Sequence, residues 1–284
     1  MDPRLADLVG LLDLENIEID IFRGESRDIG SPQVFGGQVL GQALMAANRT
    51  VETRRAHSLH AYFLRRGDVN APIVYQVERA RDGRSFTNRR ITAIQHGQQI
   101  FNMTASYQID AEGLEHRVSM PNVPGPDECH DIAEATEADL KDFPQKVQLF
   151  MKHRRPFFAR PVRRGRMGEA MQPVKHVWMK AVDVLPDDRE LHQSLLAYIS
   201  DYELLATATI PHGQSSSFRR FLQMASLDHA MWFHRPCRVD EWLLFSYDSP
   251  SASSSRGLAR GQVFTQEGVL VASTAQEGLI RLRR

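Results

Sequence analysis

The sequence predicts an α+β fold built from two tandem copies of one unit, each an antiparallel sheet wrapped around one long helix. The first observation is the order of elements, because a strand, a helix and several strand-like runs follow one another twice along the chain. The second is a recurrence of residues. "SLHAYFLRRGD" (58–68) resembles "SLDHAMWFHRP" (226–236), and "HGQQIFNMTASYQ" (96–108) resembles "EGVLVASTAQEG" (267–278).

The first copy combines a central helix with a set of strand-like runs. Helical spacing over 5–12 leads into an alternating run at 16–22, which is typical of a half-buried strand. A helix rich in small residues is predicted within "SPQVFGGQVLGQALMAANRT", where two apolar stripes make a broad surface suited to close packing. Strand-like runs follow, with Asp-Gly and His-Gly pairs marking hairpin turns: "HSLHAYFL", "IVYQVERA", "SFTNRRITAIQ" and "QQIFNMTASYQI".

The second copy repeats this order. "VKHVWMKAVD" alternates like a strand, and "RELHQSLLAYISDYELLATA" is predicted to be a helix because five large apolar residues from Leu191 to Leu205 share one face. Four strands are expected to close the chain, at 222–235, 240–249, 254–265 and 269–282.

The stretch between the copies differs in composition. "MPNVPGPDE" is rich in proline, and "KHRRPFFARPVRRGR" (152–166) is a basic run interrupted by prolines. We predict a linker over 119–166 with one amphipathic helix near 131–152. The expected units are therefore 1–118 and 167–284, the second carrying the candidate catalytic residues.

The overall composition narrows the possible functions. Thirty-five basic residues balance thirty-five acidic ones, which argues against nucleic acid as the main partner. The only cysteines, Cys129 and Cys237, form no C-x-x-C pair, so a disulfide framework or a cysteine zinc site is not expected and a reducing compartment fits. Neither a signal peptide, nor an apolar run of membrane-spanning length, nor a Ser-Lys-Leu tail is recognised. The expected location is the cytoplasm.

The segment "ASLDHAMWFHRP" could suggest a metal site, but strand geometry argues against it. Asp228 and His234 share one face of a strand yet lie six residues apart, about 20 Å along it. Asp228 and His229 point to opposite faces. His229 alternates with apolar residues, so the favoured interpretation is a core histidine with a satisfied ring. No metal site is predicted here.

Three polar residues are candidates for chemistry, each with a structural alternative. Asp201 interrupts an apolar helix and is either a solvated residue or a buried carboxylate with a raised pKa, able to accept a proton from water. Ser226 places a small hydroxyl at the start of a strand, facing a cleft or serving structure only. Gln276 interrupts an otherwise apolar strand, where its amide either orients a water or points outward.

Familiar catalytic motifs are missing. The chain lacks the G-x-S-x-G elbow of serine hydrolases and the phosphate-binding loop, and "GGQVLG" is a weak dinucleotide fingerprint. Gly36 and Gly37 either form a tight turn or leave approachable N–H groups at the start of a helix, which could hold an oxyanion.

Several segments in a fixed order resemble the type II acyl-CoA thioesterase family, over nearly the whole chain except about 119–160. That family has a double hot-dog fold, two tandem hot-dog units, each an antiparallel sheet wrapped around a long helix. The segments are "RGESRDIGSPQVFGGQVLGQAL", "HSLHAYFLRRGD", "RDGRSFTNRRITAIQHGQQIFNMTASYQ", "DHAMWFHRP" and "SASSSRGLARGQVFTQEGVLVASTAQEGLIR".

The resemblance implies that Asp201, Ser226 and Gln276 form the catalytic set. Ser226 stands where threonine is expected in many bacterial relatives, which keeps the hydroxyl. Arg66 replaces an expected proline at a strand end. The implied reaction is hydrolysis of fatty acyl-CoA, of medium to long chain, to fatty acid and CoA by one activated water, with no cofactor and no metal.

Other parts of the implied picture concern binding and assembly. Backbone N–H groups near Gly37 and Gln38 are expected to hold the oxyanion, unless the first helix serves structure only. The basic run 152–166 either meets the phosphates of CoA or is a solvated linker or part of an intersubunit salt bridge. His60 stays outside the catalytic set. A homodimer or higher homo-oligomer is expected by analogy.

Two rival functions remain at the level of sequence. An enoyl-CoA hydratase on the same fold would need an Asp–His pair, and His192 is the only histidine near Asp201 in sequence. A non-catalytic acyl-CoA sensor would bind substrate without turnover.

Overall fold

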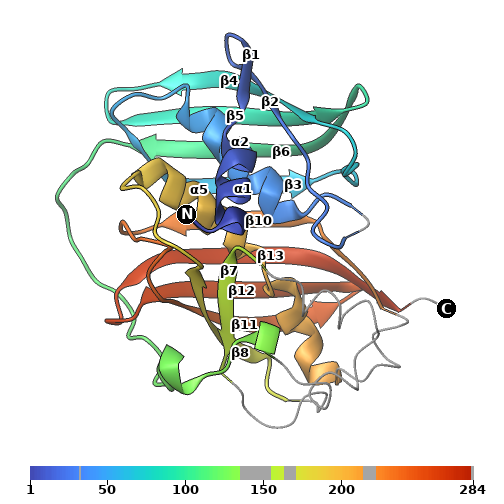
Figure 1. The fold of residues 1–284 in the computed structure, drawn as a ribbon, viewed down its shortest axis with the longest axis vertical. Coiled ribbons are helices and arrows are strands. Elements are labelled where there is room, and N and C mark those ends of the chain that lie inside the picture. The colour runs from blue at the N-terminus through green and yellow to red at the C-terminus, as the bar shows by residue number, and fades with distance from the viewer. Residues whose placement is uncertain (32, 135–154, 163–170, 214–221, 283–284) are drawn as a thin grey trace.

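The computed structural model describes residues 1–284 except 32, 135–154, 163–170, 214–221 and 283–284. Most of the amphipathic helix predicted near 131–152, and parts of the basic run 152–166, lie outside the described residues. The described strands form one antiparallel sheet in the order β1-β2-β4-β5-β6-β3-β10-β13-β12-β11-β8-β7, with β9 paired to β13. Figure 1 shows this sheet curving around the central helices.

The first half of the sheet comes from the N-terminal part of the chain, blue to green in Figure 1. Its central helix α2 is enclosed, because most of its residues are buried. The elements of this half are α1 (Pro3–Leu12), β1 (Glu15–Glu18), β2 (Ile21–Gly24), α2 (Gly36–Asn48), β3 (Arg55–Phe63), β4 (Ile73–Asp82), β5 (Phe86–Gln95) and β6 (Gln98–Gln108).

The second half repeats the arrangement around helix α5. Its elements are η1 (Pro126–Glu128), η2 (Ile132–Glu134), β7 (Phe157–Pro161), β8 (Val174–Ala181), α5 (Arg189–Ser200), η3 (Leu205–His212), β9 (Leu222–Ser226), β10 (Asp228–Phe233), β11 (Leu243–Ser253), β12 (Arg256–Thr265) and β13 (Leu270–Leu282). Strand β7 lies inside the stretch expected to be a linker and pairs with β8 at the edge of the sheet.

The two halves join through a strand pair and a helix pair. Strands β3 and β10 are antiparallel neighbours, so the sheet continues from one half into the other. Helices α2 and α5 pack so closely that a Cβ at Gly37 would lie 2.1 Å from the carbonyl oxygen of Tyr198, and one at Gly41 3.1 Å from that of Ser194. The small residues of α2 therefore permit the close helix approach that the sequence predicted.

The strand expected at 222–235 is interrupted, which corrects the prediction. Ser226 pairs with Gly278 and Ala230 pairs with Ala275, so the register against β13 shifts by one residue around Leu227. The carbonyl of Leu227 accepts from the N–H of Phe63 in the first half. The break arises where the strand gains its second neighbour, because β9 pairs with β13 alone and β10 pairs with both β13 and β3.

The helix expected from 189 to 208 is also shorter than predicted. It ends at Ser200, and Asp201 is its C-terminal capping residue. Glu203 then takes a left-handed conformation with φ 65°, which turns the chain away from the helix axis. None of the described helices has the length and apolar character needed to cross a bilayer.

Candidate active site

Asp201 lies where the C-terminus of α5 meets the N-terminus of α2. Its side chain is only 6% exposed. The carboxylate accepts a hydrogen bond from Nε2 of Gln276 at 2.6 Å, and the backbone N–H of Gly37 lies beside it. Burial raises the pKa of Asp201 to about 6, although both of these donors act in the opposite direction. A buried carboxylate with this pKa can act as a general base near neutral pH.

The two glycines that begin α2 make room for this carboxylate. A Cβ at Gly36 would lie 2.7 Å from Oδ2 of Asp201, and a Cβ at Gly37 would collide with the backbone of α5. The N-terminus of a helix also favours a nearby negative charge. The double glycine thus permits contact between one half and the carboxylate of the other.

The expectation that N–H groups near Gly37 and Gln38 hold an oxyanion stays a prediction. The N–H of Gln38 donates to the carbonyl of Phe35 at 3.1 Å. The N–H of Gly37 lies beside the carboxylate of Asp201 and helps to lower its pKa.

Gln276 points inward from the middle of β13 and is 1% exposed. Its Nε2 donates to Oδ1 of Asp201 and, at 3.2 Å, to Nδ1 of His229. Both amide hydrogens are therefore used. Among the described residues, its Oε1 has no hydrogen-bond partner. The outward-facing alternative is excluded, and the amide can offer the site only an acceptor.

His229 completes the buried network from β10. Its Nε2 lies 3.0 Å from the hydroxyl of Ser200, and that hydroxyl donates to the carbonyl of Ala197. Nδ1 faces Gln276 and lies 4.0 Å from Oδ1 of Asp201. Burial lowers the pKa of His229 to about 3, so the ring is neutral. The predicted core histidine with a satisfied ring is confirmed, but its contact with Gln276 was missed.

Ser226 ends β9 on the same side of the sheet as Gln276. It pairs with Gly278, and antiparallel partners project to the same face, as do residues two apart on one strand. Because Gly278 is two residues from Gln276, Ser226 is displaced from Gln276 by about 7 Å in the direction of the strands. The side chain of Ser226 is half-buried. Asp201 and Gln276 are in direct contact, and Ser226 shares their side of the sheet.

The other histidines raised by the sequence lie elsewhere. His60 is on the exposed face of β3, with its ring 5.3 Å from that of Trp232. His192 accepts from the backbone N–H of Val239 at 3.2 Å. The histidine near Asp201 is thus His229, which comes from a distant part of the sequence.

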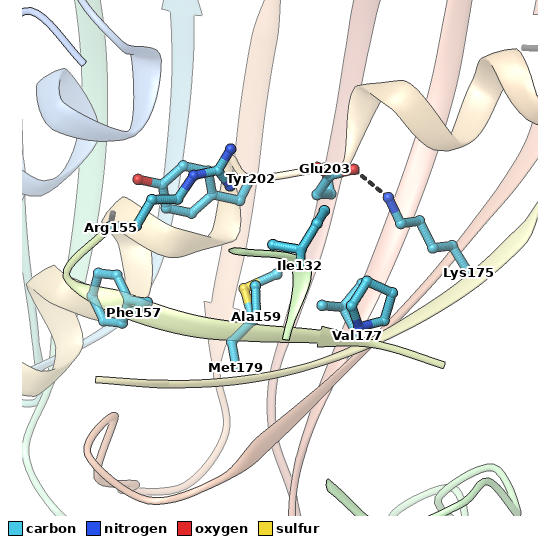
Figure 2. Close-up of a pocket in the computed structure, with 10 residues that line it drawn as sticks. Ile132, Arg155, Phe157, Ala159, Lys175, Val177, Met179, Tyr202 and Glu203 are labelled. Atoms are coloured by element: carbon cyan, nitrogen blue, oxygen red, sulfur yellow. Dashed lines mark hydrogen bonds and ion pairs between the residues drawn. The ribbon is translucent and has the colours of Figure 1, made fainter. Parts of the chain in front are cut away.

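A pocket lies between the strands β7 and β8 and the residues that follow α5 (Figure 2). Phe157, Val177 and Met179 form much of its apolar wall, and Tyr202, the neighbour of Asp201, lines it from above. The pocket is small and partly open to solvent. An ion pair between Lys175 and Glu203 lies on its other side.

The described part of the basic run packs against the protein. The guanidinium of Arg155 lies 5.2 Å from the ring centre of Tyr202, and that of Arg160 lies 4.6 Å from the ring centre of Trp242. Arg160 also donates to the carbonyl of Pro126. These arginines therefore have structural contacts, which favours the linker alternative for this part of the run.

Comparison with known proteins matches both halves. A family described as acyl-CoA thioesterase matches residues 146–279, and one described as acyl-CoA thioesterase N-terminal domain matches 23–108. Acyl-CoA thioesterase 2 of Haemophilus influenzae is 41% identical over 284 residues, 99% of each chain. The chain belongs to the type II acyl-CoA thioesterase family. Human acyl-coenzyme A thioesterase 8 is 39% identical, over 99% of this chain and 91% of its own.

Solved structures of this thioesterase family agree with the fold. The crystal structure of the acyl-CoA thioesterase II TesB2 from Mycobacterium marinum has a TM-score of 0.80 and 42% identity, covering 97% of this chain and 98% of its own. A hot-dog protein from Alicyclobacillus acidocaldarius at 19% identity, with a TM-score of 0.78 over 98% of this chain and 99% of its own, shares the fold alone. The double hot-dog prediction is confirmed.

Proposed function

We propose that this thioesterase hydrolyses acyl-CoA by direct attack of one water held between Asp201, Ser226 and Gln276. The observation that carries the proposal is the buried contact between Asp201 and Gln276, which places a base of raised pKa beside an unpaired amide oxygen. Carboxylates are common general bases, and their efficiency is greatest when the pKa lies near the working pH.

The chemical steps need no cofactor, metal or covalent intermediate. Asp201 accepts a proton as the water oxygen bonds to the thioester carbonyl carbon, which gives a tetrahedral intermediate. The intermediate collapses by breaking the carbon–sulfur bond, and the departing thiolate of CoA takes the proton from Asp201. A thiol with a pKa of about 8.5 is a good leaving group, so a weak acid suffices to protonate it. Ser226 and Oε1 of Gln276 orient the water.

We further propose that the small apolar pocket lined by Tyr202 receives the first carbons of the acyl chain, because Tyr202 follows the proposed base directly in the chain. Burial of one methylene contributes about 0.8 kcal/mol. Substrates of medium to long chain are proposed from the family resemblance, with fatty acid and free CoA as products.

Other expectations stay predictions. They are the division into units 1–118 and 167–284 with 119–166 between them, a homodimer or higher homo-oligomer, contact of the basic run with CoA phosphates, and a cytoplasmic location.

The test is thiol release from acyl-CoAs of graded chain length, with Asp201→Asn beside the wild type. We expect the variant to lose about 10³-fold in kcat, within the range for a general base, while acyl-CoA binding by calorimetry survives. Asp228→Asn is the matched control, because this half-buried carboxylate accepts from the N–H of Glu277 and an asparagine oxygen can do the same.

Each rival has its own outcome in this experiment. Tight binding without thiol release at any chain length would favour the sensor. Loss of enoyl absorbance without free thiol would favour the hydratase. Full activity of Asp201→Asn would remove the proposed base.

A further inference from the structure

We propose that His229 is a positioning residue that keeps the Gln276 amide in one orientation throughout the reaction, so that Oε1 always faces the water. This inference rests on the proposed function, in which Gln276 orients the attacking water. His229 itself does not meet the substrate in this scheme. Its ring is fully buried behind the amide.

The hydrogen bonds around the ring define which nitrogen carries the proton. The Ser200 hydroxyl donates to the carbonyl of Ala197, so its oxygen is left to accept from Nε2–H of His229. In a neutral ring the other nitrogen, Nδ1, then holds only a lone pair. That lone pair accepts from Nε2–H of Gln276. The hydrogen bonds therefore run in one direction: Gln276 donates to His229, His229 donates to Ser200, and Ser200 donates to the carbonyl of Ala197.

Asp201 alone cannot maintain this orientation. As an ionised carboxylate it accepts from Nε2 of Gln276, which holds the amide nitrogen towards it. Once it has taken the proton of water, its O–H can donate, and an amide rotated by 180° would satisfy it equally well through Oε1. The rotation would also turn Oε1 away from the water site at the moment when the intermediate forms.

His229 prevents that rotation because its protonation does not change during the cycle. A rotated amide would place Oε1 against the lone pair of Nδ1, so two acceptors would face each other without a proton between them. Oδ1 of Asp201 lies 4.0 Å from Nδ1 of the ring, and burial outweighs this neighbour in keeping the ring neutral. The orientation of Gln276 is therefore independent of the charge on Asp201.

The test compares two substitutions that differ in the acceptor they leave. His229→Leu removes the lone pair, and His229→Asn places an amide oxygen close to the position of Nδ1. For His229→Leu we expect a kcat about 100-fold lower with a nearly unchanged KM, as for a small misplacement of a reacting group. We expect His229→Asn to recover most of kcat. Thermal unfolding of each variant shows that it is folded.

A double-mutant cycle with Gln276→Ala separates positioning from a general structural role. If His229 acts through Gln276, adding His229→Leu to Gln276→Ala lowers kcat no further. The proposal would be overturned if the loss of kcat in the double variant equalled the product of the losses in the two single variants. It would also be overturned if His229→Asn were folded but as inactive as His229→Leu.

The failure of this inference can be told apart from failure of the proposed function. If Asp201→Asn is inactive, and the kcat losses of His229→Leu and Gln276→Ala multiply in the double variant, only the role of His229 is removed. An active Asp201→Asn removes the proposed mechanism itself.

Discussion

The two halves of the molecule can be aligned residue by residue through one shared turn. In the first half, two consecutive N–H groups, beginning at Leu64, donate to the carbonyl of Ile100. In the second half, two consecutive N–H groups, beginning at His234, donate to the carbonyl of Val271. These equivalent points fix the correspondence of β3 with β10 and of β6 with β13. They also shift the repeat by two residues from the alignment of 58–68 with 226–236 that the sequence suggested.

The aligned positions carry opposite chemistry. Leu59 pairs with Ala105 in the first half, where the second half has His229 and Gln276 in contact. All four side chains are buried. The same register that packs apolar groups under α2 therefore holds a polar network under α5, and only one copy of the fold contains the candidate site.

The C-terminal ends of the two central helices, α2 and α5, also differ in their chemistry. Beyond α2, the buried guanidinium of Arg89 donates to both oxygens of Thr50 and to Asp82, so a hydrogen-bonded cation closes this end. Arg89 pairs with Ala105, and the residue that pairs with Gln276 is Ala259. The second half thus has an alanine where the first has an arginine, and its helix ends in a carboxylate that depends on Gly37 of the first half.

This difference indicates a division of labour between the halves. The first half supplies the start of α2, which lies against the carboxylate of Asp201. Among the described residues each half keeps a buried amide atom without a hydrogen-bond partner, Nδ2 of Asn48 in the first and Oε1 of Gln276 in the second. Only the amide of Gln276 is in contact with a buried carboxylate of raised pKa, so the candidate chemistry belongs to the second half. This difference can be tested by replacing polar residues of the second half with the residues that occupy the equivalent positions of the first half.

Gln276→Ala, which introduces the residue of the first half, is expected to have the largest effect of these substitutions. The water loses its acceptor and Asp201 loses one donor, so we expect kcat to fall about 10²–10³-fold, as when one preorganised hydrogen bond is removed at an active site. The measurement is steady-state thiol release. Thr274→Ala is the control, because Thr274 lies two residues away on the same face of β13 and is also buried. An equal loss in both variants would contradict the specific role of Gln276.

The pH dependence of activity tests the burial of Asp201. Only its ionised form accepts a proton, so kcat is expected to fall as the pH drops through about 6, tenfold for each further unit. Gln276 lowers the pKa of Asp201, so in Gln276→Ala the residual activity should decline at a higher pH. Rates from pH 4.5 to 9 provide the measurement. A kcat that stays constant down to pH 4.5 would show that burial does not raise the pKa of the base to about 6.

The same shift predicts a change in stability. Because the folded-state pKa is raised above 3.8, the folded protein retains the proton longer than the unfolded chain. The free energy of unfolding therefore falls between about pH 4 and pH 6 by roughly 3 kcal/mol from this group, and stays lower above pH 6. Asp201→Asn removes this contribution. Urea unfolding at pH 4 and pH 7, compared between the two proteins, measures the difference.

The sequence predicted the architecture well because strand and helix periodicities recur in both halves. The identity of Asp201, Ser226 and Gln276 as a set came from the family resemblance, since they are separated by up to 75 residues and no local pattern connects them. The role of His229 was missed for a related reason. Its contact with Gln276 depends on the register of β10 against β13, and its alternation with apolar residues indicated only burial.

Two other features were not predicted, for physical reasons. A carboxylate from the other half lies at the start of α2, and only the packing of α2 on α5 brings it there. Strand β7 was hidden in a segment with prolines and arginines. It forms because a sheet edge tolerates proline, and Pro161 is its last residue.

Ser226→Ala is expected to have the smallest effect on activity. Counting from the shared turn places Ala56 of β3 at the position of Ser226, so this change also introduces the residue of the first half. The hydroxyl supplies one of several contacts to the water, and a neutral hydrogen bond contributes about 1 kcal/mol. We therefore expect kcat to fall about fivefold, and Ser226→Thr, which keeps the hydroxyl, to stay near the wild-type rate. If the alanine and threonine variants lose activity equally, the side-chain volume at the end of β9 matters and the hydroxyl does not. A loss confined to alanine would place the hydroxyl in contact with the water, on the same side of the sheet as Gln276.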